Sequence, residues 1–535
     1  MEQRVSQFQI AKAIKKEHKK IAWFIDDTGD VSRHSGMNFV LFEKFANKIF
    51  GFKPIFTGAS IDSSKSIEII ENSSRKLTNL SDFLSFKYKG IDVGKLCASF
   101  YIYLEQRLEL NQSDLSTIKL KNILYDTVTS IEIASEVLTD SDIQQVISYN
   151  GGYPPHRAFL QFARNKGLDI VSLEGGINLS RFHSILRFCP GFDMEEWAYL
   201  HKRWPTIKDL PLDAKHISES RDHLLAVLKR ESTHCYSVKA GKWNSASLNE
   251  KFNCSAYEKV VLVATSSEDE LKAASICGVN HITDSLFNDQ IEWLNEIIDF
   301  AKANTKILFI IRIHPREFEN HVSVMASRFL QLLLNSCPEN VKVNLPEDEI
   351  SAHDFIHVAD LLLVALSNLA TEFLMLGVPV LRYCKTIAYP DDHGYLSNTS
   401  KKIYFDDLLT LCNTNLPFED IRYAYRFNAI NRSASKLRLI KSNFIATVQC
   451  LILRVLHLIS KGINSRKLLY IIKSLILIQE KKPEKGIINT PLEKSYILER
   501  RYSTIKDKES LMEDETKTIK LSISETRKVL GLEGL

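Results

Sequence analysis

Two apolar runs, each followed at once by polar residues, constrain the fold of this chain more than any other feature. The first begins at Ile307, is rich in β-branched residues and ends in the sequence Arg-Ile-His-Pro-Arg at 312–316. The second, at 361–366, ends in Ser-Asn at 367–368, where a helix is predicted to begin. Such runs alternating with helical segments are typical of a parallel sheet, whose strand ends meet at one edge. Ligands of open α/β sheets bind at that edge.

The polar residues at these strand ends are suited to binding an anion. Arginine offers a fork of N–H donors to phosphate, and the start of a helix presents unbonded backbone N–H groups. A third apolar run, beginning at Lys259, ends in further hydroxyls. The sequence therefore predicts a nucleotide-phosphate site made of Ser266, Ser267, Arg312, His314, Arg316, Ser367, Asn368 and Glu372. The alternative is structural: a turn that ends a strand at His314-Pro315, and ordinary helix caps at the serines.

Acidic residues follow two apolar runs in the first half of the chain. Asp26, Asp27 and Asp30 come after the run at 21–25, and Glu174 ends the run at 168–173. A carboxylate at such a strand end can act as a general base toward a hydroxyl. Turns also favour these residues, so the alternative of a plain turn stays open.

Composition sets the scale of the molecule. A chain of 535 residues exceeds one hydrophobic core, and its 44% apolar content is ordinary for a folded protein. The nine cysteines show no CxxC pair or metal-ligand spacing, which predicts reduced thiols in a cytoplasmic protein. We expect no secretory signal and no spanning helix, since neither an apolar leader nor a charge-free stretch of about 20 apolar residues is found. The phosphate-binding and dinucleotide-binding glycine patterns, HExxH and GxSxG are absent, which argues against NTPases, dehydrogenases, zinc proteases and α/β-hydrolases.

The fold class predicted is α/β, with two doubly wound Rossmann-like domains and a C-terminal helical extension. The expected units are an N-terminal, acceptor-side domain at 1–205, a helical connection at 206–258, a nucleotide-sugar-binding domain at 259–412, basic amphipathic helices at 413–482, and a charged tail at 483–535 that forms a surface helix or is partly disordered. Lys and Arg dominate the fourth unit, where Glu480 is the single acid between residues 421 and 482. Amphipathic basic helices either lie on an anionic membrane or pack their apolar faces on the protein.

The second half resembles the donor-binding domain of GT-B glycosyltransferases that build bacterial capsule and lipopolysaccharide. The strand-His-Pro element at 312–317 and the pattern S-N-x-x-x-E-x-x-x-x-G-x-P at 367–379 carry the resemblance. The first half is similar to the acceptor-side domain of that group through Asn150-Gly151, Arg157 and Glu174-Gly175. That group commonly has arginines where this chain has Gly152 and Gly175-Gly176, so an arginine-dependent contact is in question. His-Pro and Asp-Asp elements also occur in transferases that use CMP-activated acidic sugars.

The resemblance implies a metal-independent sugar transfer, with a CMP- or UDP-linked nucleotide sugar as substrate and no separate cofactor. It assigns Asn150 and Arg157 to a glycan or lipid-linked acceptor, His314 to the nucleotide phosphate and an N-terminal acid to the base. We expect a cytoplasmic protein, peripheral on the inner membrane face, with no nucleic-acid partner. Three alternatives remain: a glycerol- or ribitol-phosphate transferase, a sugar-nucleotide epimerase of the same fold, and a catalytically silent scaffold that binds a glycan or a membrane.

Overall fold

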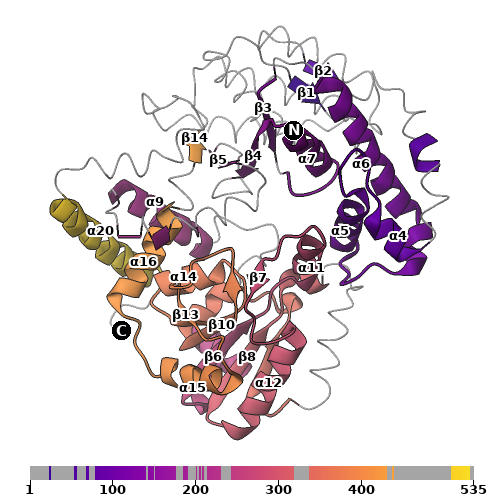
Figure 1. The fold of residues 1–535 in the computed structure, drawn as a ribbon. Coiled ribbons are helices and arrows are strands. Elements are labelled where there is room, and N and C mark those ends of the chain that lie inside the picture. The colour runs from indigo at the N-terminus through magenta and orange to yellow at the C-terminus, as the bar shows by residue number, and fades with distance from the viewer. Residues whose placement is uncertain are drawn as a thin grey trace, which may run out of the picture.

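The protein is described by a computed structural model in which two α/β halves are joined by helices (Figure 1). The residues described are 23–25, 54–56, 68–71, 79–139, 143–149, 151–175, 185–190, parts of 201–212, 214–229, 243–318, 337–430, 436–438 and 508–530. The predicted α/β class is confirmed, because the second half is built on a six-stranded parallel sheet covered by helices on both faces.

The sheet of the second half is doubly wound. Its strands are β6 (Lys259–Ala264), β8 (Ile307–Arg312), β9 (Val341–Asn344), β10 (Leu361–Val364), β11 (Val380–Arg382) and β13 (Tyr395–Leu396). They lie in the order β13-β11-β10-β6-β8-β9, and every neighbouring pair is parallel. The chain runs from β6 outward to β9 and then crosses back to β10 on the other side of β6. The strand order therefore reverses between β6 and β10.

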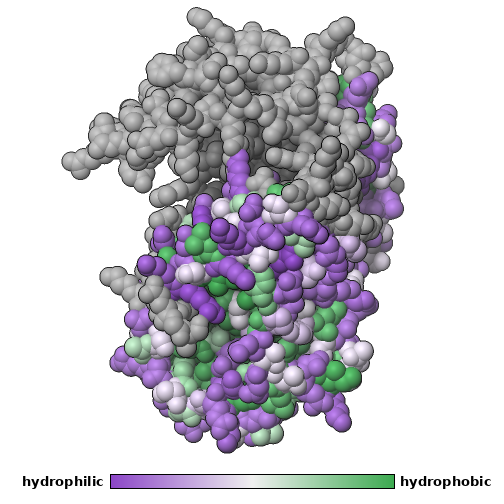
Figure 2. All heavy atoms as spheres, turned by 90° about the vertical axis from the view of Figure 1, so that its left-hand side faces the viewer, coloured by the Kyte–Doolittle hydropathy of each residue, from purple (hydrophilic) through white to green (hydrophobic). Residues whose placement is uncertain are grey.

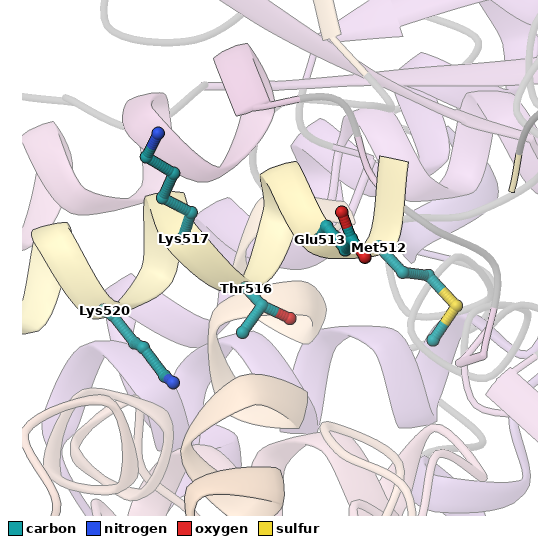
Figure 3. Close-up of a pocket in the computed structure, with 5 residues that line it drawn as sticks. All are labelled: Met512, Glu513, Thr516, Lys517 and Lys520. Atoms are coloured by element: carbon teal, nitrogen blue, oxygen red, sulfur yellow. The ribbon is translucent and has the colours of Figure 1, made fainter. Parts of the chain in front are cut away.

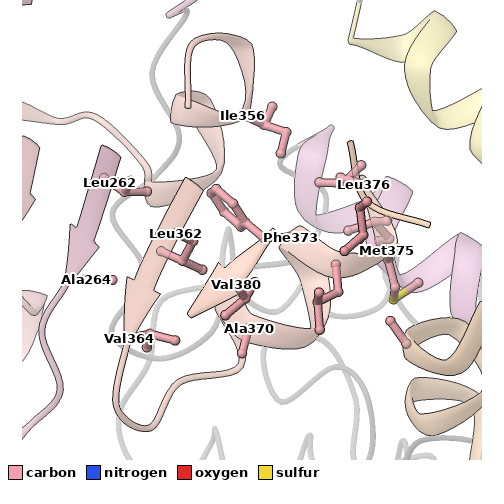
Figure 4. Packing of buried hydrophobic residues seen from close by; sticks show 14 of the residues in the cluster. Leu262, Ala264, Ile356, Leu362, Val364, Ala370, Phe373, Met375, Leu376 and Val380 are labelled. Carbon is pink, nitrogen blue, oxygen red and sulfur yellow. The ribbon is translucent and has the colours of Figure 1, made fainter. Parts of the chain in front are cut away.

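Strand residues alternate between two hydrophobic cores, one on each face of this sheet. The helices that cover it are α9 (Ala214–Leu228), α10 (Ser245–Phe252), α14 (Leu369–Met375), α16 (Phe418–Ala429) and α20 (Lys508–Val529) on one face, and α12 (Gln290–Ala303) and α15 (Lys401–Leu411) on the other. On the first face, Leu262, Leu362 and Val380 point toward Phe373 of α14 (Figure 4). Such strands, buried on both faces, read in the sequence as continuous apolar runs.

The described residues of the first half form two small sheets. Its strands are β1 (Trp23–Ile25), β2 (Pro54–Phe56), β3 (Gln145–Tyr149), β4 (Asp169–Gly175) and β5 (Ile185–Pro190), joined by β14 (Lys436–Arg438) from far along the chain. β1 pairs with β2 and β3 with β4 in parallel, as a doubly wound sheet requires. β5 and β14 then add antiparallel strands, so the described part of the larger sheet is mixed.

Helices of the first half pack directly on the second half. The helices are α4 (Leu80–Ser85), α5 (Val93–Glu105), α6 (Ile118–Val137) and α7 (His156–Asn165). Their hydrophobic core also takes in Ala273 of α11 (Glu268–Ile276), which belongs to the second half. Figure 1 shows α11 beside α5. The two halves thus share buried apolar surface at this contact.

Polar side chains at helix starts set several boundaries. Asn79, Thr117, Asn244, Asp289 and Ser400 each accept a hydrogen bond from a backbone N–H in the first turn of the helix that follows. Such caps satisfy donors that the helix itself leaves unbonded. These polar residues therefore set where the five helices begin.

The C-terminal segments are arranged differently from the sequence-based prediction. Within the predicted basic helices at 413–482, α16 is helical, but Lys436–Arg438 forms β14 and pairs antiparallel with β5. Of the predicted charged tail at 483–535, α20 is a docked helix with Glu515 and Ile519 fully buried. Met512 and Leu521 on the same helix are exposed. Hydrophilic residues cover much of the described surface on the side of the molecule that lies at the left in Figure 1 (Figure 2).

Candidate functional site

Two loops are bonded together at the point where the strand order reverses. Ser266 follows β6, and its hydroxyl donates a hydrogen bond of 2.7 Å to the carbonyl oxygen of Leu366, which follows β10. The backbone N–H of Ser266 donates to Oε1 of Gln290 at 2.6 Å. In open α/β sheets this crevice is where ligands bind.

Two buried arginines lie at strand ends on either side of this crevice. Arg312 ends β8 and Arg382 ends β11, with β6 and β10 between them. Their side chains are 4% and 0% exposed. Among the residues that the structure describes, neither the Nε nor the Nη1 of either arginine has a hydrogen-bond partner. Nη2 of Arg382, by contrast, donates to the carbonyl oxygens of Pro390 and Asp391 at 3.1 and 2.9 Å.

Burial makes the charge on Arg312 costly. Loss of hydration lowers the pKa of its guanidinium to about 10. The carboxylates of Asp348, Asp354 and Glu347 act in the opposite direction and raise this pKa, but by less. Buried polar groups are nearly always hydrogen-bonded, and an unbonded charge costs more than an unbonded neutral group. An anion at the carboxyl edge of the sheet would supply the missing acceptors.

His314 lies just beyond Arg312 and is partly exposed. Its backbone N–H donates to Oγ1 of Thr265 at 2.8 Å, which fixes the loop after β8 to the loop after β6. Burial and then the charge of Arg312 lower the pKa of the imidazole to about 4, so the ring is neutral near pH 7. Nδ1 accepts a hydrogen bond from the backbone N–H of Arg316 at 3.3 Å. The tautomer that accepts at Nδ1 carries its proton on Nε2.

Arg316 points away from the crevice. Its Nε donates to Oδ2 of Asp269 at 3.0 Å, and its Nη2 lies 2.9 Å from the same oxygen. The same Nη2 donates to the backbone oxygen of Tyr103, on α5 of the first half. The structure therefore places Arg316 at the contact between the two halves.

The predicted serines hold the loops in shape. The hydroxyl of Ser267 donates to Oδ1 of Asp269 at 2.6 Å. The hydroxyl of Ser367 accepts from the backbone N–H of Leu369 at 3.3 Å. The backbone N–H of Ser367 donates to the hydroxyl of Tyr389, and that hydroxyl donates to the backbone oxygen of Ser367. Asn368 is exposed beside them at the start of α14. The hydroxyl of Ser367 therefore caps a backbone N–H at the start of α14, whereas the hydroxyl of Ser267 makes no cap bond to α11. The phosphate role of the serines stays a prediction.

Glu372 on α14 is bonded to histidine instead of facing open space. Its side chain is 1% exposed, and Oε2 lies 2.7 Å from Nε2 of His353. Oε1 lies 3.6 Å from Nε2 of His223, on α9. Helix α14 begins at Leu369, so the fourth residue of the helix turns toward the layer of helices and not toward the crevice.

The first half contributes fewer described site residues. Arg157 lies in the first turn of α7, is 8% exposed and donates from Nη1 to the carbonyl of Gly152 at 3.3 Å. Burial, and then the charge of Arg157, lowers the pKa of His281 in the second half. Glu174 lies in β4 opposite Arg187 of β5. Asp26, Asp27, Asp30 and Asn150 lie outside the described residues.

Several residues that contact the predicted site residues or lie at this edge were missed by the sequence analysis. They are Tyr103, His223, Gln290, His353, Arg382 and Tyr389. Arg382 could have been found, because it ends an apolar run in the same way as Arg312. The others could not, because their contacts join residues that are distant in the sequence. Gln290, for example, bonds to Ser266 from the start of α12.

The rest of the described chain offers fewer features of a binding site. Within it, no group of three or more His, Cys, Asp or Glu side chains is placed to hold a metal ion. No helix there is both long and apolar enough to cross a bilayer. A shallow hollow of about 470 Å³ lies on α20, lined by Met512, Glu513, Thr516, Lys517 and Lys520. Lys517 and Lys520 point in different directions, so the hollow has no convergent polar groups (Figure 3).

Neither the protein-family models nor the curated proteins include a match to this chain. Solved structures do show similarity. A KpsC β-Kdo 2,7-transferase from Thermosulfurimonas dismutans is 14% identical, with a TM-score of 0.30 over 55% of this chain and 80% of its own. The UDP-GlcNAc 2-epimerase of Methanocaldococcus jannaschii is 15% identical, with a TM-score of 0.29 over 57% of this chain and 80% of its own.

The wall teichoic acid polymerase TagF is 13% identical, with a TM-score of 0.20 over 60% of this chain and 59% of its own. These neighbours are a transferase, an epimerase and a polymerase. At such low identities and TM-scores the neighbours do not assign a reaction. The residues at the carboxyl edge of the sheet therefore carry the functional argument.

Proposed function

We propose that the protein transfers a sugar from a nucleotide-sugar donor to a hydroxyl group of a surface-glycan acceptor. The observation that carries the proposal is the buried guanidinium of Arg312, two of whose donors lack partners among the described residues, beside the neutral imidazole of His314. Both lie at the edge where ligands of such sheets bind. A phosphate at this place would supply acceptors to Nε and Nη1 of Arg312.

The chemistry needs charge to be stabilised on the departing nucleotide. When the bond between sugar and phosphate breaks, negative charge develops on the phosphate oxygens. A guanidinium and an imidazole N–H that are already in position stabilise this charge more in the transition state than in the ground state. We assign Arg312 to the charge and Nε2 of His314 to a hydrogen bond with one phosphate oxygen.

The acceptor side rests on the first half of the chain. The base is assigned to one acid among Asp26, Asp27, Asp30 and Glu174, and acceptor contacts to Arg157 and Asn150. Arg157 supports this arrangement, because it lies at the start of α7, just after the loop at the carboxyl end of β3. A glycan acceptor is a polyhydroxyl molecule, and arginine donates readily to its oxygens or to a carboxylate on it.

Binding and product assays test the proposal together. Calorimetry with CMP, UDP, CDP and GDP should show one preferred nucleotide, and product analysis with the matching sugar donor should show a new glycosidic bond. The amide variant of the true base should lose turnover and keep nucleotide affinity. A protein that binds none of the four nucleotides contradicts the proposal, as does full activity in all four variants, Asp26→Asn, Asp27→Asn, Asp30→Asn and Glu174→Gln.

Location at an anionic membrane surface is part of the same proposal. The basic stretch at 439–482 lies outside the described residues, and its charge supports the idea. Each basic residue near an anionic leaflet contributes about 1 kcal/mol, and salt weakens the attraction. Sedimentation with anionic vesicles at low salt and release at high salt would support it. No binding at any salt concentration would contradict it.

A further inference from the structure

Arg316 joins the loop after β8 to helix α5 of the other half of the molecule. It lies two residues after His314, and its backbone N–H donates to Nδ1 of that histidine. Its guanidinium carbon lies 4.3 Å from the centre of the Tyr103 ring, and Nη2 donates to the backbone oxygen of the same residue. Asp269 holds the guanidinium in this orientation with two contacts at about 3 Å. The position of Arg316 therefore affects both the ring of His314 and helix α5.

The contact continues from Tyr103 to the loop after β3. The rings of Tyr103 and Tyr153 are stacked with their centres 4.5 Å apart, and Phe100 lies 5.6 Å from Tyr153. Tyr153 belongs to the loop between β3 and α7, and its carbonyl oxygen accepts from the backbone N–H of Arg157 at 2.9 Å. The start of α7, where Arg157 lies, is thus bonded to the residue that stacks on Tyr103.

We propose that Arg316, Tyr103 and Tyr153 couple the loop after β8 to the loop after β3, so that each loop positions the other. On the proposed function, on which this inference rests for its catalytic meaning, the first loop holds the nucleotide phosphate and the second holds the acceptor. Arg316, Tyr103 and Tyr153 are then positioning residues that act through His314 and Arg157. The sequence had assigned Arg316 to the phosphate, and the coupling gives it a different task.

Arginine is suited to this position for a physical reason. A planar guanidinium can stack on a ring, bond to a carboxylate and donate to a carbonyl oxygen at the same time. A lysine keeps the charge beside Asp269 but cannot combine these contacts. Because coupling between two sites is reciprocal in free energy, a change at either end of the contact must be felt at the other.

Amide hydrogen exchange on the full-length protein without ligand tests the coupling. In Arg316→Lys, exchange in the segment 151–160 is expected to speed up about fivefold or more. In Tyr153→Leu, the amides of His314, Arg316 and Glu317 are expected to speed up in turn, although the substitution lies in the other half. A matched control is Phe405→Leu, which removes a ring stacked at 4.4 Å on Phe300 within the second half. The control should leave both segments unchanged.

The results separate the coupling from the proposed function. Faster exchange at both distant ends, with the control unchanged, supports the coupling whether or not the protein binds a nucleotide. If either distant end keeps its wild-type rate in a folded variant, the coupling is overturned. Where the wild-type protein binds a nucleotide, Tyr153→Leu should also weaken that binding several-fold. A wild-type protein that binds no nucleotide counts against the proposed function and leaves the exchange result to decide the coupling.

Discussion

Two sets of buried arginine side chains have different surroundings, one under α20 and one at the carboxyl edge of the six-stranded sheet. Under α20, Arg422 and Arg426 both bond to the fully buried carboxylate of Glu515 at 2.8–2.9 Å. The same carboxylate accepts from the backbone N–H of Leu212. At the carboxyl edge of the sheet, two nitrogens of Arg312 have no partner among the described residues. A buried charge that is paired serves to dock an element, whereas an unpaired one at a ligand-binding edge indicates a ligand.

The largest effect is expected where the charges are paired. Glu515→Gln removes the buried counter-charge that Arg422 and Arg426 share. Arg422 then keeps only its bond to the exposed carboxylate of Glu419. The substitution should therefore lower the free energy of unfolding by about 3–5 kcal/mol. Chemical denaturation followed by circular dichroism measures this loss. The affinity for nucleotide in the folded fraction should not change. A loss below about 1 kcal/mol would show that the two buried places do not differ as described.

The next effect concerns catalysis. His314→Ala removes one N–H donor from the departing phosphate, so turnover should fall about 10²- to 10³-fold with little effect on folding. Steady-state kinetics with the preferred donor measures it. The control is His357→Ala, which removes a partly buried histidine at the end of the short helix Ala352–His357. This variant should keep its turnover. An unchanged rate in His314→Ala would remove the histidine from the site.

Arg312→Met sharpens the comparison directly. Removing a hydrogen bond to a charged group costs about 1.5–3 kcal/mol, so nucleotide affinity should fall roughly 10- to 100-fold. Unlike Glu515→Gln, this variant should be as stable as the wild type or more stable, because an unpaired buried charge is replaced by an apolar chain of similar length. Calorimetry measures the nucleotide affinity, and chemical denaturation measures the free energy of unfolding. Lower stability with unchanged affinity would assign Arg312 a structural role.

A smaller effect is expected from acid. His393 is 2% exposed and bonds to Thr371, and burial lowers the pKa of its imidazole to about 3. Between pH 6.5 and about 3 the unfolded chain therefore binds a proton that the folded protein does not. Stability falls as pH falls through this window. In His393→Asn the decline should be shallower, as measured by denaturation midpoints at several pH values. Parallel pH profiles of the variant and the wild type would contradict this.

The smallest effect is expected in the hollow on α20. Lys517→Ala and Lys520→Ala remove charges that point in different directions over a shallow surface. Surface substitutions of this kind change stability by less than about 0.5 kcal/mol, and nucleotide affinity should be unaffected. A nucleotide affinity that drops in either variant would move the candidate site from the sheet edge to α20.

The edge of the sheet could be predicted because its signals are local. The apolar run that ends at Arg312 and the Pro315 that follows mark a strand end, and the structure has β8 end at Arg312. The same reasoning found β6, β10 and the start of α14. Glu372 was placed on the correct helix, but its contacts with His353 and His223 could not be foreseen. These residues are 19 and 149 positions from Glu372, and no periodicity links them.

The sequence alone determined that β6, β8 and β10 are strands, that β8 ends at Arg312 and that polar residues follow each of the three. Apolar runs and the polar residues that follow them are properties of short segments. A short segment is therefore enough to recognise them. Only the tertiary structure decided that Arg316 turns to Tyr103, that Glu515 docks α20 and that β14 joins the first sheet. Each of these contacts depends on how segments that are distant in the sequence are brought together, and no local sequence pattern indicates such contacts.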